Sequence, residues 1–244
     1  MKYAIMSDIH SNLEALKATL KDVQSFKPDK ILCLGDVVGY GAQPAEALEL
    51  TRKAVEDSGG VCLAGNHDHA VVEMTDVTYF NAYAVAAVDY ARAHLGQEAL
   101  KYLAALPLVK EMGDFVLAHA SLEIPERWDY IMNTSSAQPS LRKLKSSMLF
   151  IGHTHLPGVC REEKKWESVS EGRVELIPGE KIVVNVGSVG QPRDGRHEAC
   201  WVLFDDKIGE LYFRRVNYNV QKTQEKILKA GLPDVLAKRL SLGR

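Results

Sequence analysis

The sequence predicts an α/β fold with a mostly parallel β-sheet, and two observations predict it. In the first quarter of the chain, short apolar segments alternate with amphipathic segments, which is typical of parallel strands joined by crossover helices. After about residue 159, apolar and polar residues alternate with a period of two, which favours antiparallel strands. The chain has 244 residues, 46% of them hydrophobic and 25% charged, so it can bury a substantial core.

The first five expected elements give the order of a parallel sheet. Residues 2–6, 30–34 and 61–64 are short apolar runs that end at polar residues or glycine, so each is expected to form a buried strand. A helix is expected from Leu13, where apolar residues recur with helical spacing. Another is expected from Pro44, since proline suits the first turn of a helix.

The rest of the chain adds a helical segment and more strands. Residues 81–106 are rich in alanine and are expected to form two helices hinged near Gly96. The other expected elements are strands at 115–118 and 148–151, a loop at 128–136, a short helix at 141–145, a solvated hairpin at 161–167, antiparallel strands at 174–177, 182–186, 200–204 and 211–216, and a helical pair at 221–230 and 235–240. We find no repeat and no linker, and expect a single domain over 1–244, with a helical insertion at about 69–106 and a C-terminal helical tail at about 219–244.

Composition and charge argue against several classes of protein. The formal net charge of −2 gives no overall attraction to nucleic acid or to an anionic membrane. No apolar run reaches the roughly 18 residues that a membrane span requires. Asp8 and His10 stand where a signal peptide would be apolar. The four cysteines are widely separated and form no C-x-x-C pair, so neither disulfides nor a zinc–thiolate site is expected, and a cytoplasmic location fits best.

Metal-ligating side chains follow five of the expected strands at the point where each strand ends. They are Asp8 and His10, then Asp36, then Asn66 with His67 and Asp68, then His119, and finally His153 with His155. In open α/β sheets the carboxyl ends of the strands form the crevice where ligands bind, so these segments are expected to converge. Gly35, Gly65 and Gly152 would let the backbone turn sharply there. Each residue alone could be a helix cap, a turn residue or a structural histidine, but five such coincidences in succession favour one functional site.

The ligand types predict a centre with two metal ions. Imidazole nitrogens with carboxylate and amide oxygens suit divalent Mn, Fe, Zn or Ni. Seven candidates exceed the needs of one tetrahedral ion and suit two ions that share a bridging carboxylate; they are Asp8, His10, Asp36, Asn66, His119, His153 and His155. Two ions roughly 3.5–4 Å apart clamp a phosphoryl group for in-line displacement, and a bridging water becomes hydroxide near neutral pH. The sequence therefore predicts a metal-dependent hydrolase of phosphate esters.

The order D-x-H, G-D, G-N-H-D, H, G-H-x-H resembles the calcineurin-like metallophosphoesterase superfamily. The later stretch NVGSVGQPRD, residues 185–194, resembles the branch of small bacterial and archaeal phosphodiesterases and related diadenosine tetraphosphate hydrolases. The resemblance spans about residues 1–216. It implies a four-layer sandwich, with two mixed β-sheets face to face and helices outside. It also implies that Asp8, His10 and His155 hold one ion, that Asn66, His119 and His153 hold the other, and that Asp36 bridges them.

The resemblance also implies roles in catalysis and substrate binding. His67 would contact the phosphoryl oxygen and protonate the leaving group, which agrees with the pH range in which histidine titrates. Asp68 would orient His67, or else cap the following helix. Asn66 would contact the substrate beside His67. Arg193 could bind a phosphate that bears a second substituent, or be an exposed turn residue, and Tyr40, between two glycines, could stack on a base or leaving group, or simply pack.

The expected substrate is a small, nucleotide-like phosphate ester, cleaved by a phosphodiesterase or phosphatase. In a narrower version the substrate is a dinucleoside polyphosphate, and residues 81–106 with the loop at Trp128 and Tyr130 line its groove. A nuclease of the same superfamily would need a basic stripe, and the basic residues here are interspersed with acids. A protein phosphatase would use the same chemistry with another groove. A scaffold without turnover is disfavoured, because every expected ligand position is intact. Neither the native metal nor the oligomeric state is indicated by these motifs.

Overall fold

Two six-stranded β-sheets form the centre of the protein, whose computed structural model describes residues 1–162 and 164–244. The strands are β1 (Lys2–Met6), β2 (Lys30–Cys33), β3 (Val61–Cys62), β4 (Val109–Glu111), β5 (Phe115–Ala118), β6 (Met148–Ile151), β7 (Gly158–Arg161), β8 (Glu167–Ser168), β9 (Gly172–Glu175), β10 (Ile182–Asn185), β11 (Ala199–Asp205) and β12 (Glu210–Val216). The first sheet has the strand order β3-β2-β1-β11-β12-β9, and the second has the order β4-β5-β6-β10-β7-β8.

Each sheet contains one group of parallel strands. Strands β1, β2 and β3 are parallel in the first sheet, and β5, β6 and β10 are parallel in the second. The remaining neighbours are antiparallel, as β1 is with β11. The segment 182–186, expected to be antiparallel, pairs antiparallel with β7 but parallel with β6. The preceding strand, β9, belongs to the first sheet, so the chain crosses to the second sheet before β10 begins. In that sheet β10 runs parallel to β6.

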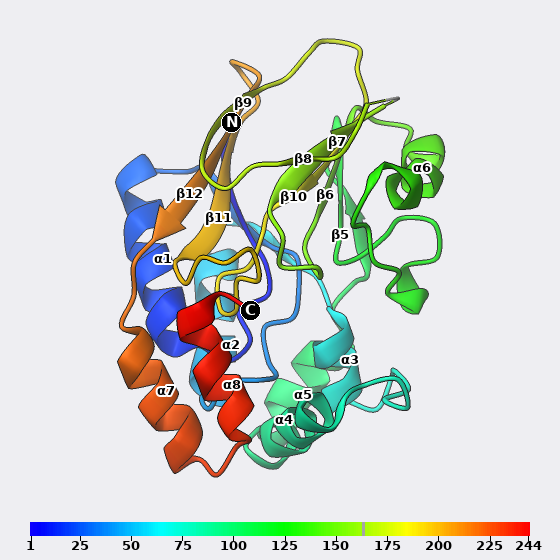
Figure 1. Ribbon diagram of the computed structural model, residues 1–244. Coiled ribbons are helices and arrows are strands. Elements are labelled where there is room, and N and C mark those ends of the chain that lie inside the picture. Colours follow the sequence, from blue (N-terminus) through cyan, green and yellow to red (C-terminus); the bar gives the residue numbers. More distant parts are fainter. Residues whose placement is uncertain (163) are drawn as a thin grey trace.

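Helices cover the outer faces of both sheets, which gives four layers (Figure 1). Helices α1 (Leu13–Phe26) and α2 (Pro44–Asp57) pack on the first sheet, and α6 (Thr134–Lys143) packs on the second. Strand β1 shows how the sequence sets this arrangement. Its Ile5 lies in the core between the sheets, whereas Met6 lies in the core under the helices, because successive strand residues point to opposite faces. The four-layer α/β sandwich is thus confirmed.

Aromatic side chains hold the two sheets together. The ring of Phe115, on the second sheet, meets the ring of Phe204, on the first, edge to face at a centroid distance of 5.5 Å. Phe150 packs against Phe115 at the same distance. Such pairs contribute about 0.5–1.5 kcal/mol beyond the burial of their area. This core fixes the two sheets relative to one another, and with them the loops at their carboxyl ends.

The helical insertion and the C-terminal tail lie at the same end of the molecule (Figure 1). The insertion contains α3 (Asn66–Val71), α4 (Ala82–Ala93) and α5 (Gln97–Ala104), and Gly96 stands at the start of α5 as the expected hinge. The tail contains α7 (Val220–Lys229), α8 (Asp234–Lys238) and the 3₁₀ helix η2 (Arg239–Leu242). Leu236 and Leu240 of the tail pack in one cluster with Ala84 of α4 and with Tyr40.

The expectation of a loop at 128–136 and a helix at 141–145 is wrong at both boundaries. Helix α6 begins at Thr134, inside the expected loop, and ends at Lys143. Its start is fixed by Asn133, whose side chain accepts a hydrogen bond from the Ser136 backbone nitrogen at 3.0 Å. The serines and the internal Pro139 conceal this helix in the sequence, because both residue types have low helical propensity.

The expected hairpin at 161–167 begins and ends on paired strands. In β7 and β8, Gly158 pairs with Ser168, while Glu163 lies outside the described residues.

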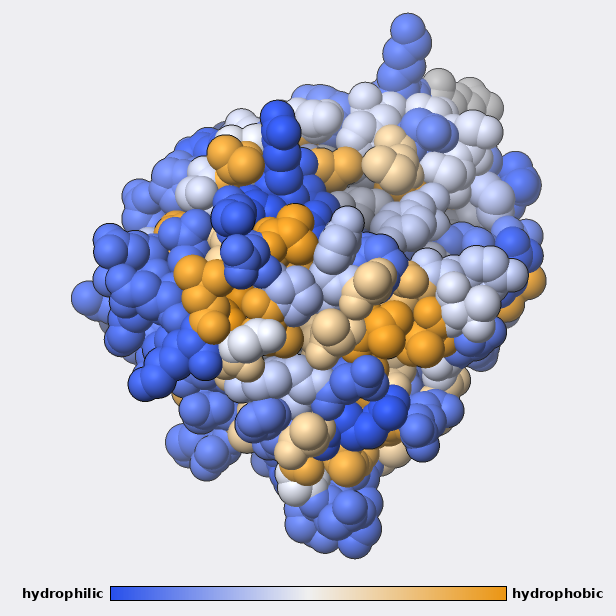
Figure 2. All heavy atoms as spheres, turned by 60° about the horizontal axis from the view of Figure 1, so that its bottom comes forward, coloured by the Kyte–Doolittle hydropathy of each residue, from blue (hydrophilic) through white to orange (hydrophobic). Residues whose placement is uncertain are grey.

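No helix among the described residues is long and apolar enough to cross a membrane. On the face drawn in Figure 2, hydrophobic residues lie in several small groups between hydrophilic ones. The exposed apolar side chains include Met74, Leu228 and Val235, and single exposed apolar residues are normal on protein surfaces.

Candidate active site

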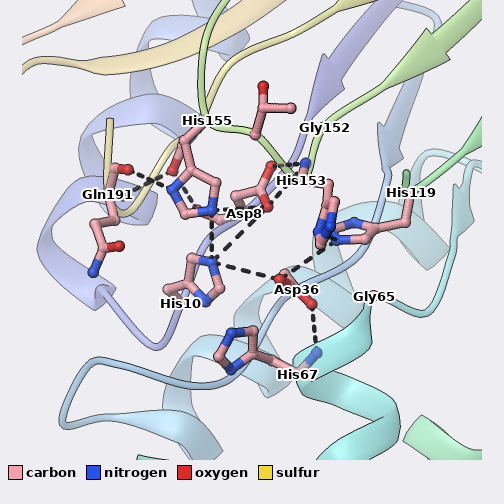
Figure 3. Close-up of polar contacts among 12 residues, drawn as sticks. Asp8, His10, Asp36, Gly65, His67, His119, Gly152, His153, His155 and Gln191 are labelled. Carbon is pink, nitrogen blue, oxygen red and sulfur yellow. Dashed lines mark hydrogen bonds and ion pairs between the residues drawn. The ribbon is translucent and has the colours of Figure 1, made fainter. Parts of the chain in front are cut away.

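The seven expected metal ligands converge at the carboxyl ends of the parallel strands. All seven are buried, although all are polar; they are Asp8, His10, Asp36, Asn66, His119, His153 and His155. Figure 3 shows six of them pointing toward one another from both sheets. Potential ligand atoms lie within 4.8 Å of one another in three groups, which are Asp8 with His10 and His155, His10 with Asp36 and His67, and Asp36 with His119 and His153. Buried polar groups gathered in this way need partners or ions.

Asp36 lies between the two halves of the cluster. Its Oδ2 is 3.6 Å from the Nε2 of His10 and 3.4 Å from the Nε2 of His119. Its Oδ1 accepts a hydrogen bond of 2.8 Å from the backbone nitrogen of His67. Burial opposes the charged carboxylate, but His119 and His67 outweigh it and hold the pKa of Asp36 well below its usual range. One oxygen of an ionised Asp36 therefore faces both groups of histidines, as a bridging ligand requires.

Three histidines are oriented by backbone carbonyl groups. Their Nδ1 atoms lie 3.1 Å from the Val38 oxygen for His10, 3.0 Å from the Leu34 oxygen for His119, and 2.6 Å from the Gln191 oxygen for His155. A carbonyl oxygen can only accept, so each Nδ1 carries the proton and donates it. Burial lowers the pKa of His10 and His155, so their Nε2 atoms are unprotonated acceptors that face the cluster, which is the state of a metal-binding imidazole. For His119, Asp36 outweighs burial and raises the pKa to about 9, so a bound cation would have to displace the proton on its Nε2.

These acceptor atoms fit divalent cations. The Nε2 atoms of His10 and His155 are 3.1 Å apart, and with both Nδ1 atoms protonated, two lone pairs face each other at this distance. The Oδ1 of Asn66 and the Nε2 of His153 are buried and have no hydrogen-bond partner among residues 1–162 and 164–244. A buried acceptor without a partner costs about 1–3 kcal/mol, and bound cations would satisfy all of these atoms. These unsatisfied acceptor atoms, in a set made of oxygen and nitrogen donors, support binding of divalent metal ions.

Backbone strain is concentrated in the same residues. Five of the seven ligands have left-handed backbone conformations, with φ of 53° at Asp8, 49° at His10, 52° at Asp36, 66° at His153 and 61° at His155. For residues other than glycine this conformation costs about 1–3 kcal/mol each. Tertiary hydrogen bonds maintain it, as from the Asp8 nitrogen to the Gly35 oxygen at 3.0 Å. Strain of this kind gathers at sites where geometry serves function rather than stability.

Comparison with known proteins agrees with this geometry. A family model described as the calcineurin-like phosphoesterase superfamily domain matches residues 1–207. The chain belongs to this superfamily. An uncharacterized protein of Methanocaldococcus jannaschii is 40% identical over 245 residues, which cover 99% of this chain and 98% of the relative. The calcineurin-like family and the buried cluster together support metal-dependent hydrolysis of phosphate esters.

Solved structures share the whole calcineurin-like fold. A metallophosphoesterase from Sphaerobacter thermophilus has a TM-score of 0.90 and 34% sequence identity, and the match covers 100% of this chain and 99% of the other. A hypothetical protein from Pyrococcus horikoshii has a TM-score of 0.82 and 22% identity, with coverage of 100% and 98%. Because both matches extend over the full chain, the helical insertion and the tail are part of the shared architecture.

His67 lies beside the expected metal ligands, in the first turn of α3. Its ring is 5.0 Å from the His10 ring and 4.5 Å from the Tyr40 ring, and its Nδ1 has no hydrogen-bond partner within the described part of the chain. Burial is the main reason that the pKa of His67 falls to about 4, which makes the imidazole neutral near pH 7. A bound phosphate dianion would favour the protonated form. His67 therefore lies next to the cluster, and its role in proton transfer stays a prediction.

Asp68 does not make the expected contact with His67. Its Oδ1 accepts hydrogen bonds from the Val37 and Val38 backbone nitrogens at 3.0 and 3.1 Å, and its Oδ2 accepts one from the Gly65 nitrogen at 2.9 Å. The carboxylate thus caps α3 and fixes the loop after β2, which is the alternative reading of this residue. Burial and then the charge of Asp36 raise the pKa of Asp68 to about 7.

Arg193 and Tyr40 lie at the border of the cluster. Tyr40 is 7% exposed, and its ring centroid is 4.6 Å from that of His10. Arg193, in the loop after β10, donates hydrogen bonds to the Oε1 of Gln191, and its Cζ is 5.8 Å from the Tyr40 ring. The Arg193 backbone nitrogen donates to the His155 oxygen at 3.3 Å, so both residues border the cluster, and their contact with a substrate stays a prediction.

The loop after β10 supports the centre in a way that the sequence does not reveal. The Ser188 hydroxyl and the Gly190 nitrogen each donate to the backbone oxygen of Asp8 at 2.8 Å. The Asn185 side chain donates to the Gly152 oxygen at 2.6 Å. The stretch 185–194 draws attention by its resemblance to a known motif, but only the fold shows that it binds the backbone of the ligand segments.

All three glycines in the ligand segments are required by close approach, since a Cβ at Gly35 would overlap the backbone of Gly65. Gly35 has a φ of 103° and turns the chain as expected. At Gly65 a Cβ would overlap the Oδ1 of Asp36, and at Gly152 it would overlap the Oδ2 of Asp8. We therefore expect Gly65→Ala to displace Asp36, lower the free energy of unfolding by about 1–3 kcal/mol and weaken metal binding.

Chemical denaturation and metal titration check this prediction. The matched control is Gly96→Ala, because a Cβ at Gly96 meets no atom within 4 Å. That control should cost no more than about 1 kcal/mol, as for the change of a helix-capping residue, and should bind metal normally. If Gly65→Ala kept wild-type metal affinity and stability, the expected overlap between the new Cβ and the Oδ1 of Asp36 would be wrong.

Proposed function

We propose that this protein is a metal-dependent phosphoesterase that acts on small, nucleotide-like phosphate esters, with phosphodiesters as the main class. The observation that carries the proposal is the position of the Asp36 Oδ2, which lies 3.6 Å from His10 Nε2 and 3.4 Å from His119 Nε2. When bound, two divalent ions supply Lewis-acid charge for the phosphoryl oxygens and activate a water molecule. The residues that would hold them are Asp8, His10, Asp36, Asn66, His119, His153 and His155.

The side chains around the centre support the choice of a small diester. His67, beside His10 and Tyr40, would donate a proton to a leaving alkoxide once a bound phosphoryl anion favours its protonated form. Arg193 offers a planar guanidinium group, which can form two parallel hydrogen bonds with the oxygens of a phosphate that carries a second substituent. Aromatic rings provide flat surfaces for a base or an aryl group, because Tyr130 stacks on His153 at 4.1 Å while it is 53% exposed. A nucleotide-like ester uses all three features.

Hydrolysis of bis-p-nitrophenyl phosphate tests the proposed function. Metal-stripped protein with added Mn²⁺ should turn the substrate over, and protein without metal should not. A parallel screen with mononucleotides, cyclic nucleotides and dinucleoside polyphosphates would rank the substrate classes. Full activity in metal-stripped protein would refute the role of the seven ligands, and no activity with any metal or ester would refute the proposed function.

His67→Gln tests whether His67 protonates the leaving group. The variant should lower kcat roughly 100-fold for a diester with an alkyl leaving group, such as a ribose alkoxide. It should lower kcat far less for a p-nitrophenyl ester, because p-nitrophenolate leaves without a proton. Steady-state kinetics with both esters measure the difference. His197→Gln is the control, since His197 is largely exposed; equal losses with both leaving groups would exclude the general-acid role.

A further inference from the structure

Two arginines from distant parts of the chain approach the same tyrosine ring. The Cζ atoms of Arg193, in the loop after β10, and of Arg239, the first residue of η2, each lie 5.8 Å from the centroid of Tyr40. The Tyr40 ring is 4.6 Å from the ring of His10 and 4.5 Å from that of His67. The tail thus places a second cation, Arg239, near the border of the buried cluster of Asp, His and Asn side chains.

No ion pair joins either guanidinium group to an acidic side chain among the described residues, whereas Arg196 and Arg215 nearby each form one. Arg193 donates to the amide oxygen of Gln191, and Arg239 donates through Nε to an oxygen of Arg244, the last residue of the sequence, at 2.6 Å. Nearby arginines behave differently, since Arg196 forms an ion pair with Glu198 at 2.7 Å. Burial, followed by the charge of Arg193, lowers the pKa of Arg239, so the two like charges repel each other. A half-buried pair of this kind favours an anion from outside.

The two arginines are held in place by contacts between the loop and the tail. The Gly195 nitrogen donates to the Gly243 oxygen at 3.0 Å, and a Cβ at Gly243 would overlap the backbone of Arg196. Tyr40 itself has a φ of 52° and packs against Leu240 and its neighbours in the tail. The positions of both cations are therefore fixed before any ligand arrives, which reduces the entropic cost of binding.

We propose that Arg193 and Arg239 form an anion site for a second phosphoryl group of the substrate, next to the phosphoryl group at the metal centre. The inference rests on the proposed function and narrows its substrate class to compounds with two or more linked phosphoryl groups. Guanidinium groups bind phosphoryl oxygens through two parallel hydrogen bonds, and two such groups match the charge of a pyrophosphate unit. A simple diester would leave Arg239 without a ligand.

Competitive inhibition of bis-p-nitrophenyl phosphate hydrolysis tests the site, with pyrophosphate and orthophosphate as probes at saturating Mn²⁺. Arg239→Gln should weaken inhibition by pyrophosphate roughly 10-fold to 100-fold, as expected for hydrogen bonds to a charged group. Inhibition by orthophosphate and the kcat for the simple diester should change less than about threefold. Lys238→Gln is the control, because Lys238 stands next in the chain, carries the same charge and is 73% exposed. Equal loss for both inhibitors, or no loss, would overturn the proposal.

Calorimetric titration of metal-loaded protein with pyrophosphate separates this proposal from the proposed function. If wild-type protein hydrolyses no ester but binds pyrophosphate, and Arg239→Gln alone loses that binding, the anion site stands while the proposed function fails. If hydrolysis is intact and Arg239→Gln binds pyrophosphate as the wild type does, only the anion site fails. Arg239→Lys keeps the charge without the planar fork and should bind with intermediate affinity. It also replaces Arg239→Gln if that variant does not fold, and wild-type affinity in Arg239→Lys would exclude a guanidinium-specific contact.

Discussion

Removal of the divalent metal is expected to lower the melting temperature by roughly 10–15 °C for each ion lost. A ligand present at about 1,000 times its dissociation constant stabilises the folded state by about 4 kcal/mol. In a protein of this size, each kcal/mol shifts the melting temperature by roughly 2–4 °C. The effect should be large here because the metal-free cluster keeps its unfavourable features. The Nε2 atoms of His10 and His155 still face each other at 3.1 Å, and the left-handed backbone at Asp8 remains strained.

Scanning calorimetry of chelated and reloaded protein measures this shift. Titration with Mn²⁺ or Zn²⁺ should recover the higher melting temperature in two binding steps. His197→Ala should show the full shift, since its exposed side chain lies outside the cluster. A shift below about 2 °C after complete chelation would show that the seven residues do not bind metal as a unit.

The position of the metal ligands could be predicted from the sequence because it follows from a local rule. Each ligand comes directly after an apolar run, and the carboxyl ends of parallel strands meet at one edge. The ligands after β1, such as Asp8, and those after β6, such as His155, therefore converge without any knowledge of the loops between them. The orienting Gln191 oxygen could not be predicted, because a carbonyl group has no signature in the sequence.

Other features depend on contacts between distant segments. The partners of Asp68 are backbone nitrogens of Val37 and Val38, about thirty residues earlier, and that pairing exists only once β2 and α3 are adjacent. Arg239 carries no pattern that separates it from other basic residues of the tail. Its position beside Tyr40 results from the packing of Leu240 and its neighbours. Sequence patterns therefore predict which side chains converge better than they predict the residues that orient those side chains.

Asp36→Asn is expected to lower kcat/KM roughly 10,000-fold and to leave the fold intact. The asparagine oxygen can still accept the hydrogen bond from the His67 nitrogen, which Asp36 accepts at 2.8 Å. The amide nitrogen then replaces the oxygen that faces His10 and His119, and an amide nitrogen cannot bind a cation. Because each ion supplies several kcal/mol of transition-state stabilisation, the loss of a shared ligand should remove about 5 kcal/mol of it.

The same substitution should lower the stability of the metal-free protein without unfolding it. The histidines hold the pKa of Asp36 well below its usual range, so the ionised carboxylate stabilises the folded state near pH 7, and a neutral amide loses that contribution. Metal-free Asp36→Asn should therefore melt below the temperature of the metal-free wild type, while its metal stoichiometry falls below two. Asp89→Asn, an exposed change on α4, is the control and should keep wild-type kinetics. Loss of activity accompanied by unfolding would mean that Asp36 supports the fold, and wild-type kcat/KM would mean that the ions need no carboxylate between His10 and His119.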